Sequence, residues 1–254
     1  MSSKASTTIG FERRFNHALL REHDDFLAAA GGPQPPRPPN LERIVELNRG
    51  PFLDAQPPLR CLAEPPADAV VLDVRPTAAF VAGHRRGAVG IPVSGSSFAT
   101  KAAFVLPLER PLVLHAASAE EAREAARRLH AVGILGVAGW QEGGGCEALR
   151  PVALDELERL LADGAVELLD VREADERDDG YIPGSKNLPY RTARAAAEAG
   201  LLDGKPVVTI CESGPRAAVA ASVLQSVGVD ARPVLDGGVS TWRGETTSFR
   251  RCGT

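Results

Sequence analysis

A stretch of this chain is repeated about a hundred residues further on, and the repeat limits the possible folds more than any other feature. Residues 69–92 read AVVLDVRPTAAFVAGHRRGAVGIP, and residues 166–189 read VELLDVREADERDDGYIPGSKNLP, with a shared LDVR starting at Leu72 and at Leu169. Residues 110–134 and 205–229 form a second matching pair, and VAGWQEGG and VLDGGVSTW form a third. Each unit therefore has about the length of one ordinary domain.

Within each unit, short apolar runs alternate with helical patterns, and Gly or Pro marks the joins. Runs such as VVLDV and PVVTI are typical of central strands buried on both faces. Residues 152–164, VALDELERLLADG, predict a helix that ends at Gly164. The fold class that follows is α/β, with two domains that each hold a parallel sheet flanked by helices.

The first fifty-odd residues belong to neither repeat. Residues 31–40 contain five prolines and are expected to be extended, whereas residues 41–50 predict a short amphipathic helix ended by Gly50. Because Ile44, Val45 and Leu47 have little use in a disordered tail, we expect an extended and helical strap lying on the repeats. The predicted organisation is an N-terminal extension with a Pro-rich linker (1–58), a first domain (59–147) and a second domain (148–254).

Composition narrows the partners and the compartment. Of 254 residues 44% are hydrophobic and 24% charged, and the net charge of −4 comes with no basic run that would follow a nucleic acid. The N-terminus is too polar for a signal peptide, and no apolar run is long enough to cross a bilayer, so we expect a cytoplasmic protein without membrane or nucleic-acid partners. The four cysteines form no C-x-x-C, which indicates neither a zinc site nor a disulfide framework.

Cys211 directly follows the apolar run PVVTI, at the carboxyl end of a predicted parallel strand, where open α/β sheets bind ligands. A cysteine after a strand often only packs, but the residues that follow favour a working thiol. They are Glu212, Ser213, Gly214, Pro215 and Arg216, with a helix from Ala217 to about Val227. Gly214 allows a positive φ and Pro215 suits a first helical turn, so loop amides can turn toward the sulfur and help it ionise. Arg216 is close enough to close the ring around an anionic substrate group.

The first unit serves as a control for this interpretation. Alignment of the two units places Ala116 opposite Cys211 and Glu121 opposite Arg216, so the first unit has neither nucleophile nor cation and is predicted to be inactive. His84 and His115 are interpreted as structural, because neither has a thiol or metal partner nearby. Cys61, Cys146 and Cys252 lack a comparable loop and are predicted to be bystanders.

The second unit resembles the rhodanese (sulfurtransferase) family. The resemblance lies in C-x-x-G-x-R at Cys211, Gly214 and Arg216, in the LDVR of each unit, in GYIPGSKNLP and in LDGGVSTW, and it is weaker in the first unit. It implies a rhodanese fold and transfer of sulfane sulfur through a persulfide on Cys211, with no cofactor. By position, Asp170 and Arg172 would brace the site as a structural ion pair.

The N-terminal segments TTIGFERRFNHAL and NLERIVELNRG are similar to the stretch before two rhodanese units in bacterial metallo-β-lactamase/rhodanese fusion proteins. The sequence contains no H-x-H-x-D-H motif, so no metal and no dioxygenase activity are expected. This resemblance makes a metallo-β-lactamase-fold protein a possible partner.

The predicted reaction is double displacement, in which Cys211 takes sulfur from a small donor and passes it to a thiophilic acceptor. Glu212 places a carboxylate next to the nucleophile, which favours a donor such as a glutathione-type persulfide over the thiosulfate dianion, unless that side chain points to solvent. Three alternatives stay open: a phosphatase or arsenate reductase built on the Cys-Arg loop, a sulfur-carrier module for a partner protein, and a purely structural or regulatory role.

Overall fold

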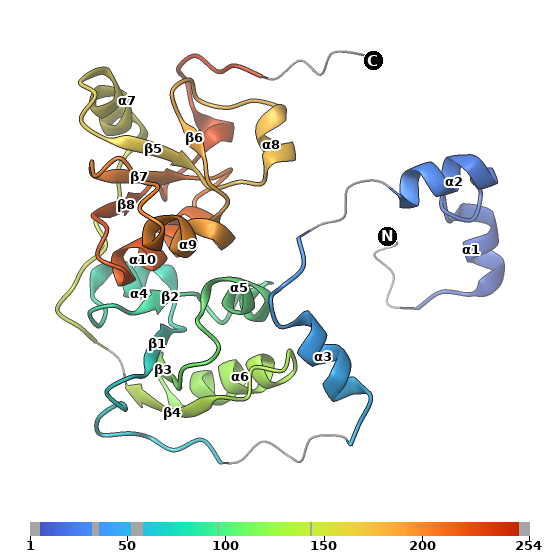
Figure 1. The fold of residues 1–254 in the computed structure, drawn as a ribbon, viewed down its shortest axis with the longest axis horizontal. Helices are drawn as coiled ribbons and strands as arrows, with labels where there is room; N and C mark the ends of the chain where they lie inside the picture. Colours follow the sequence, from blue (N-terminus) through green and yellow to red (C-terminus); the bar gives the residue numbers. More distant parts are fainter. Residues whose placement is uncertain (1–5, 32–35, 52–57, 96, 143, 249–254) are drawn as a thin grey trace. The chain divides into compact units, whose positions relative to one another are not determined.

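Two four-stranded parallel sheets with the same strand order organise the protein (Figure 1). They are seen in a computed structural model that describes residues 6–31, 36–51, 58–95, 97–142 and 144–248. The chain divides into two compact units, Met1–Arg37 and Pro38–Thr254, and both sheets lie in the second. The first unit holds α1 (Ile9–Phe15) and α2 (His23–Ala30), neither of which buries a residue.

The first sheet has the order β2-β1-β3-β4 and the second has β6-β5-β7-β8. Their bounds are β1 (Val70–Asp73), β2 (Val89–Gly90), β3 (Leu112–Ala116), β4 (Val137–Glu142), β5 (Glu167–Asp170), β6 (Lys186–Asn187), β7 (Val207–Ile210) and β8 (Ala231–Pro233). Both predicted apolar runs are central strands, β1 and β7, and every residue of each is buried. The parallel α/β fold predicted from the repeat is confirmed.

Helices flank both sheets. In chain order they are α3 (Leu41–Asn48), α4 (Thr77–Ala82), α5 (Phe98–Val105), α6 (Ala119–His130), α7 (Leu154–Ala162), α8 (Ala174–Asp178), α9 (Ala193–Glu198) and α10 (Pro215–Ser226), with short 3₁₀ turns η1 (Tyr190–Thr192) and η2 (Val239–Thr241). The helix predicted over residues 152–164 is α7, and Gly164 takes the positive φ of a helix stop.

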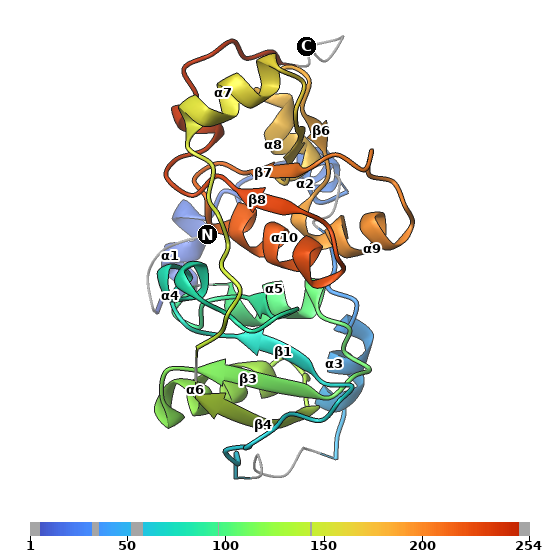
Figure 2. The ribbon, with the colours of Figure 1, turned by 90° about the vertical axis from the view of Figure 1, so that its left-hand side faces the viewer.

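α10 joins the two sheets into one core (Figure 2). Residues 217–224 are all buried, because the helix lies between its own strand β7 and the β2 edge of the first sheet. Its small alanines allow this close approach. Ser222 accepts a hydrogen bond from the Gly90 amide at 3.1 Å across the junction. The division into domains at residue 147 stays a prediction, since Pro38–Thr254 forms one compact unit.

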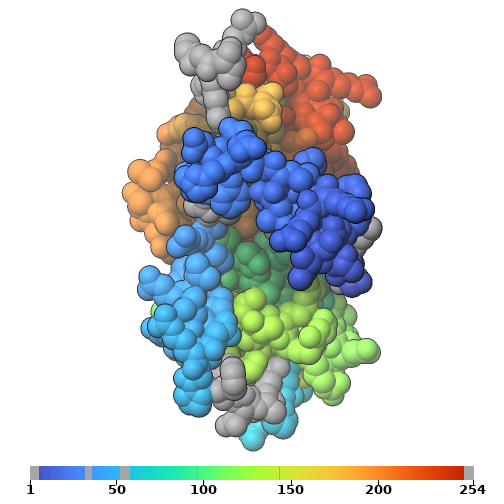
Figure 3. Space-filling model, turned by 90° about the vertical axis from the view of Figure 1, so that its right-hand side faces the viewer, coloured from blue at the N-terminus to red at the C-terminus, as the bar shows by residue number. Residues whose placement is uncertain are grey.

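Part of the predicted strap lies on the first sheet's half of the molecule. α3 occupies Leu41–Asn48, as predicted, and the Asn40 side chain donates to the Val132 carbonyl at 2.7 Å. A Cβ on Gly133 would lie 3.2 Å from Leu47 and 3.3 Å from Ile44, so α3 packs there closely (Figure 3). Gly32–Pro35 of the Pro-rich stretch lie outside the described residues.

Candidate active site

Cys211 follows β7 directly, and α10 begins four residues later at Pro215. The thiol is almost completely buried, with 1% of the residue exposed. Gly214 has a φ of +100°, and a Cβ there would lie 2.4 Å from the Leu235 carbonyl oxygen, so glycine is required on both counts. The Gly214 amide donates to the Cys211 Sγ at 3.1 Å. The loop therefore has the predicted shape, with a backbone donor directed at the sulfur.

The LDGGVSTW segment supports this loop from below. The Val239 amide donates to the Cys211 carbonyl at 3.0 Å, and the Ser240 hydroxyl donates to the Glu212 carbonyl at 2.8 Å. Gly238 leaves no room for a side chain, because a Cβ would lie 2.2 Å from the Cys211 carbonyl oxygen. The LDGGVSTW segment thus fixes the backbone of Cys211 and Glu212.

A cavity of about 420 Å³ opens in front of Cys211, and both halves of the molecule line it. The second half supplies Glu173, Tyr190, Cys211, Ser213, Pro215 and Arg216, and the first half supplies Ser97 and Lys101. Ser213 and Pro215 were predicted site residues. The sequence analysis did not find Glu173, Tyr190, Ser97 or Lys101.

Arg216 lies on the cavity wall, but its guanidinium already has a carboxylate partner. Its two terminal nitrogens donate to Glu176 at 2.5 and 2.7 Å. This hydrogen-bonded pair, which acts against the effect of burial, raises the pKa of Arg216 and lowers that of Glu176. A substrate anion would have to share Arg216 with Glu176, a partner that the sequence did not predict, and the binding role of Arg216 stays a prediction.

Glu212 differs from both sequence-based alternatives. Its carboxylate accepts from Arg172 at 3.0 Å, and it lines a neighbouring cavity of about 440 Å³ with Arg172 rather than the cavity of Cys211. Arg172 also donates to Asp170 at 2.7 Å and to the Gly180 carbonyl at 2.6 Å. Asp170 and Arg172 thus form the expected buried ion pair. Because the Glu212 carboxylate is paired with Arg172 and lines the other cavity, its repulsion of a dianionic donor at Cys211 is weakened.

Lys101 brings a positive charge toward Cys211 and Arg216 from α5. Burial, together with the charge of Arg216, lowers the pKa of Lys101, while the Cys211 sulfur has the opposite effect. One signal in the sequence could have found it: Lys101 is the single charged residue of FATKAAFV, a segment that is otherwise apolar except for Thr100. Its proximity to a residue more than a hundred positions away could not be read from that pattern.

The equivalent loop of the first half makes hydrogen bonds among its own residues. Ala116 ends β3 where Cys211 follows β7, and the Glu121 carboxylate accepts from the Ala117 amide at 2.7 Å. His115 accepts from the Gly144 amide through Nε2 at 3.2 Å, so its Nδ1 carries the proton and donates to Asp73 at 3.1 Å. These contacts are structural, as predicted.

Among the described residues, Cys61, Cys146 and His84 do not line the cavity of Cys211. His84 is buried and stacks on the Phe80 ring, and its Nδ1 is hydrogen-bonded to the Phe80 carbonyl at 2.9 Å. Cys61 and Cys146 are exposed and do not line the cavity, whereas Cys252 lies outside the described residues. In the part of the chain that the structure describes, no group of His, Cys, Asp or Glu side chains could hold a metal ion, and no helix has the length and hydropathy to cross a membrane.

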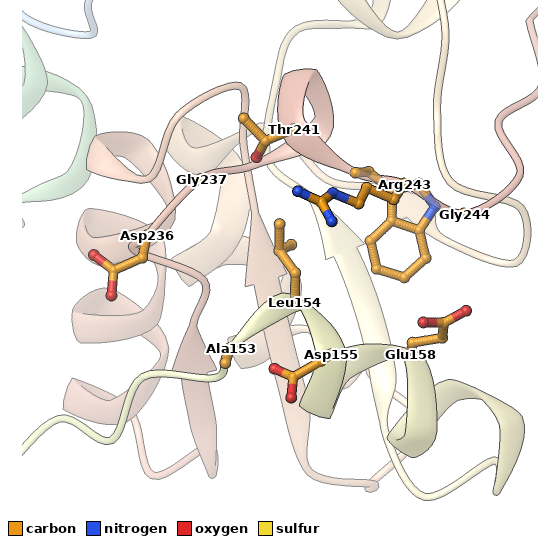
Figure 4. A pocket seen from close by; sticks show the side chains of 10 residues that line it. Ala153, Leu154, Asp155, Glu158, Asp236, Gly237, Thr241, Arg243 and Gly244 are labelled. Carbon is orange, nitrogen blue, oxygen red and sulfur yellow. The ribbon is translucent and has the colours of Figure 1, made fainter.

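A second cavity, of about 550 Å³, is larger but holds no thiol (Figure 4). Leu154 and Trp242 form its apolar part, and Asp155, Glu158 and Asp236 stand around it. Gly237 lies on its wall, so the cavity borders the segment that supports Cys211 without reaching the sulfur. Of these two cavities, the smaller one is lined by a cysteine and the larger one is not.

The fold and the site define a class: a parallel α/β protein with a buried cysteine in a short loop at the carboxyl edge of a sheet. The family model for the rhodanese-like domain matches residues 153–245. Human thiosulfate:glutathione sulfurtransferase is 31% identical over 104 residues, which cover 36% of this chain and 90% of that relative. The chain belongs to the rhodanese family. These similarities support a sulfurtransferase activity in general terms.

Solved structures give partial matches. A rhodanese-related protein from Thermoplasma volcanium is 28% identical, with a TM-score of 0.35, over 39% of this chain and 97% of its own. A metallo-β-lactamase from Staphylococcus aureus is 21% identical, with a TM-score of 0.47, over 54% of this chain and 40% of its own.

Proposed function

We propose that this protein transfers sulfane sulfur from a small donor to a thiophilic acceptor through a persulfide on Cys211. The observation that carries the proposal is the Gly214 amide directed at the Cys211 sulfur, 3.1 Å away, in a loop that opens into a cavity. A backbone donor at that position stabilises negative charge on the sulfur before and after it takes up a second sulfur atom.

The reaction has two displacement steps. The Cys211 thiolate attacks the outer sulfur of the donor, the bond from that sulfur to the rest of the donor breaks, and the electron pair leaves with the donor remnant. A thiolate or cyanide then attacks the outer sulfur of the persulfide and regenerates the Cys211 thiolate. The proposal needs no cofactor.

We also infer two rhodanese-like domains, at residues 59–147 and 148–254, of which the first is catalytically inactive. The shared strand order supports this, as does the ion pair of each LDVR motif, Asp73 with Arg75 at 2.6 Å and Asp170 with Arg172 at 2.7 Å. A metallo-β-lactamase-fold partner stays a prediction from the N-terminal sequence.

Intact-mass spectrometry tests the proposal. After incubation with thiosulfate or, separately, glutathione persulfide, the wild-type protein should gain one sulfur atom, about 32 Da, that cyanide removes as thiocyanate. Cys211→Ser is the matched control and should gain nothing. Loading that persists in this variant, or no loading from either donor, would contradict the proposal. If Cys211 loads but small acceptors do not discharge it, the sulfur-carrier role would replace the enzymatic one.

A further inference from the structure

α5 belongs to the half of the molecule that lacks a nucleophile, yet it reaches the active-site cavity. Phe98, Ala102, Ala103 and Val105 are buried, whereas Lys101 is only partly buried and lines the cavity together with Ser97. The buried residues hold the helix in the core, so the lysine is the part of α5 left to face the cavity.

Contacts with the second half hold α5 in this position. The Phe104 ring meets Tyr190, which also lines the cavity, edge to face with centroids 6.4 Å apart. Arg194 donates through Nε to the Val105 carbonyl at 3.3 Å. Because α5 is held at η1 and α9, Lys101 has a defined place opposite Cys211.

Lys101 differs from the other charged side chains of the cavity in its partners. Arg216 is matched by Glu176 at 2.5 Å, and Glu173 is matched by Arg191 at 3.0 Å. Among the residues that the structure describes, no carboxylate pairs with Lys101. A partly buried ammonium group is costly, and an anion that enters the cavity would offset that cost in addition to the ionised Cys211 sulfur. The lowered pKa of Lys101, caused chiefly by burial, is consistent with that cost.

We propose that Lys101 is a specificity-determining residue that binds the charged end of the sulfur donor and selects donors with a sulfonate group, such as thiosulfate. The first half thus completes the active site of the second. This inference rests on the proposed function and names the donor class for that same site. Glu212 does not oppose it, because its carboxylate is paired with Arg172 at 3.0 Å.

The step balances in atoms and charge. The Cys211 thiolate attacks the outer sulfur of thiosulfate, the sulfur–sulfur bond breaks, and its electron pair leaves with sulfite. One thiolate and one dianion become one persulfide anion and one dianion. Lys101 holds the sulfonate oxygens before the bond breaks and the sulfite oxygens after it.

The test compares two donors that differ at one group. Methanethiosulfonate has the same outer sulfur as thiosulfate, but a methyl group replaces one charged oxygen. We would measure the rate of sulfur loading on Cys211 against donor concentration by mass spectrometry, without an acceptor. In Lys101→Met, the half-saturating concentration should rise about 10-fold or more for thiosulfate and no more than about 3-fold for methanethiosulfonate. The maximal loading rate should change less.

Two further variants serve as controls. Lys205→Met makes the same charge change at an exposed lysine that bonds the Gly164 carbonyl, away from the cavity, and should leave both donors unchanged. Lys101→Arg keeps the charge and should restore the preference for thiosulfate. Equal effects of Lys101→Met on both donors, or no effect, would overturn the inference while wild-type loading still supported the proposed function. Failure of the wild type to load from either donor would overturn both.

Discussion

The loop after β3 and the loop after β7 occupy equivalent positions in two sheets of the same strand order, but their backbone amides have different acceptors. In the first loop the Glu121 carboxylate accepts a hydrogen bond from the Ala117 amide at 2.7 Å. In the second, the Gly214 amide points at the Cys211 sulfur at 3.1 Å. The first loop binds a carboxylate of its own, whereas the second directs an amide at a sulfur that lines a cavity.

The two halves share an arginine–aspartate pair at the strand end before each loop. Arg75 donates to Asp73 at 2.6 Å and to the Gly83 carbonyl at 2.7 Å, and Arg172 donates to Asp170 at 2.7 Å and to the Gly180 carbonyl at 2.6 Å. These two arginine–aspartate pairs hold the strand ends in both halves, although the loops after β3 and β7 differ in sequence. The comparison shows that the fold and the chemistry reside in separable residues.

The largest expected effect comes from making the second loop like the first. Cys211→Ala gives the second loop the alanine that the first loop has at the equivalent position, Ala116. Because the substitution removes the proposed nucleophile, sulfur transfer should fall at least about 1,000-fold. Thiocyanate formation from thiosulfate and cyanide measures this loss. Thermal unfolding should change little, because a buried small side chain replaces another.

The reverse substitution makes the comparison sharper. Ala116→Cys in the Cys211→Ala protein should not restore turnover, because the Glu121 carboxylate still occupies the Ala117 amide and repels an anionic donor. If this double variant gained substantial activity, the first half would be inactive for lack of a thiol alone, and the role assigned to Glu121 would be wrong.

The sequence predicted the Asp170–Arg172 ion pair and the shape of the loop around Cys211 because both depend on local patterns. Near-continuous apolar runs predict buried parallel strands, and the Gly214-Pro215 pair predicts the loop shape by backbone geometry alone. The partner of Glu212, by contrast, is Arg172, which lies forty positions earlier, at a separation that no local pattern encodes. The approach of Lys101 depends on α10 packing between two sheets, and so it required the structure.

The next prediction concerns the shared ion pairs. Asp73→Asn and Asp170→Asn each leave buried arginines without a full counter-charge and should lower the free energy of unfolding by about 3 kcal/mol. Since α10 ties both sheets into one core, urea should give a single transition that either substitution shifts. Two separate transitions, each sensitive to one substitution, would show that the halves fold independently.

The pH dependence of the Asp73 contribution has a defined sign. Burial tends to raise the pKa of Asp73, but hydrogen bonds from His115 and Arg75 outweigh burial and bring it below the ordinary value of 3.8. The unfolded state therefore binds this proton more readily. The Asp73 contribution to stability is fully present above the ordinary value and is lost as the pH falls through the folded one. The stability difference between wild type and Asp73→Asn should shrink in that acid range.

A smaller effect should separate the two halves' contributions to the site at alkaline pH. Burial and the charge of Arg216 lower the pKa of Lys101, while the Cys211 sulfur has the opposite effect. The ammonium group therefore loses its proton at a lower pH than an ordinary lysine, whose pKa is 10.5. Tyr190, whose own pKa burial raises, faces the same cavity. As the pH rises, the preference for thiosulfate over methanethiosulfonate should decline by up to about 10-fold.

The donor ratio is the measurement that isolates Lys101, because both donors react with the same Cys211 sulfur and its ionisation cancels. In Lys101→Arg the ratio should stay constant over the same range, since the guanidinium keeps its proton. A decline that persists in this variant would assign the alkaline change to another group of the cavity.

The smallest expected effect belongs to Glu212, the residue that stands next to the nucleophile in the sequence. Its carboxylate is held by Arg172 at 3.0 Å and faces the neighbouring cavity, so Glu212→Gln should change the half-saturating thiosulfate concentration by no more than about 2-fold. A charge that is already paired and partly exposed to water exerts little force on a substrate in another cavity. A large gain in thiosulfate affinity would mean that the carboxylate does repel the donor, and would return the preference to weakly charged persulfides. A small change, together with a large one for Lys101→Met, would show that α5 of the first half has more influence on donor choice than the residue next to Cys211 in the sequence.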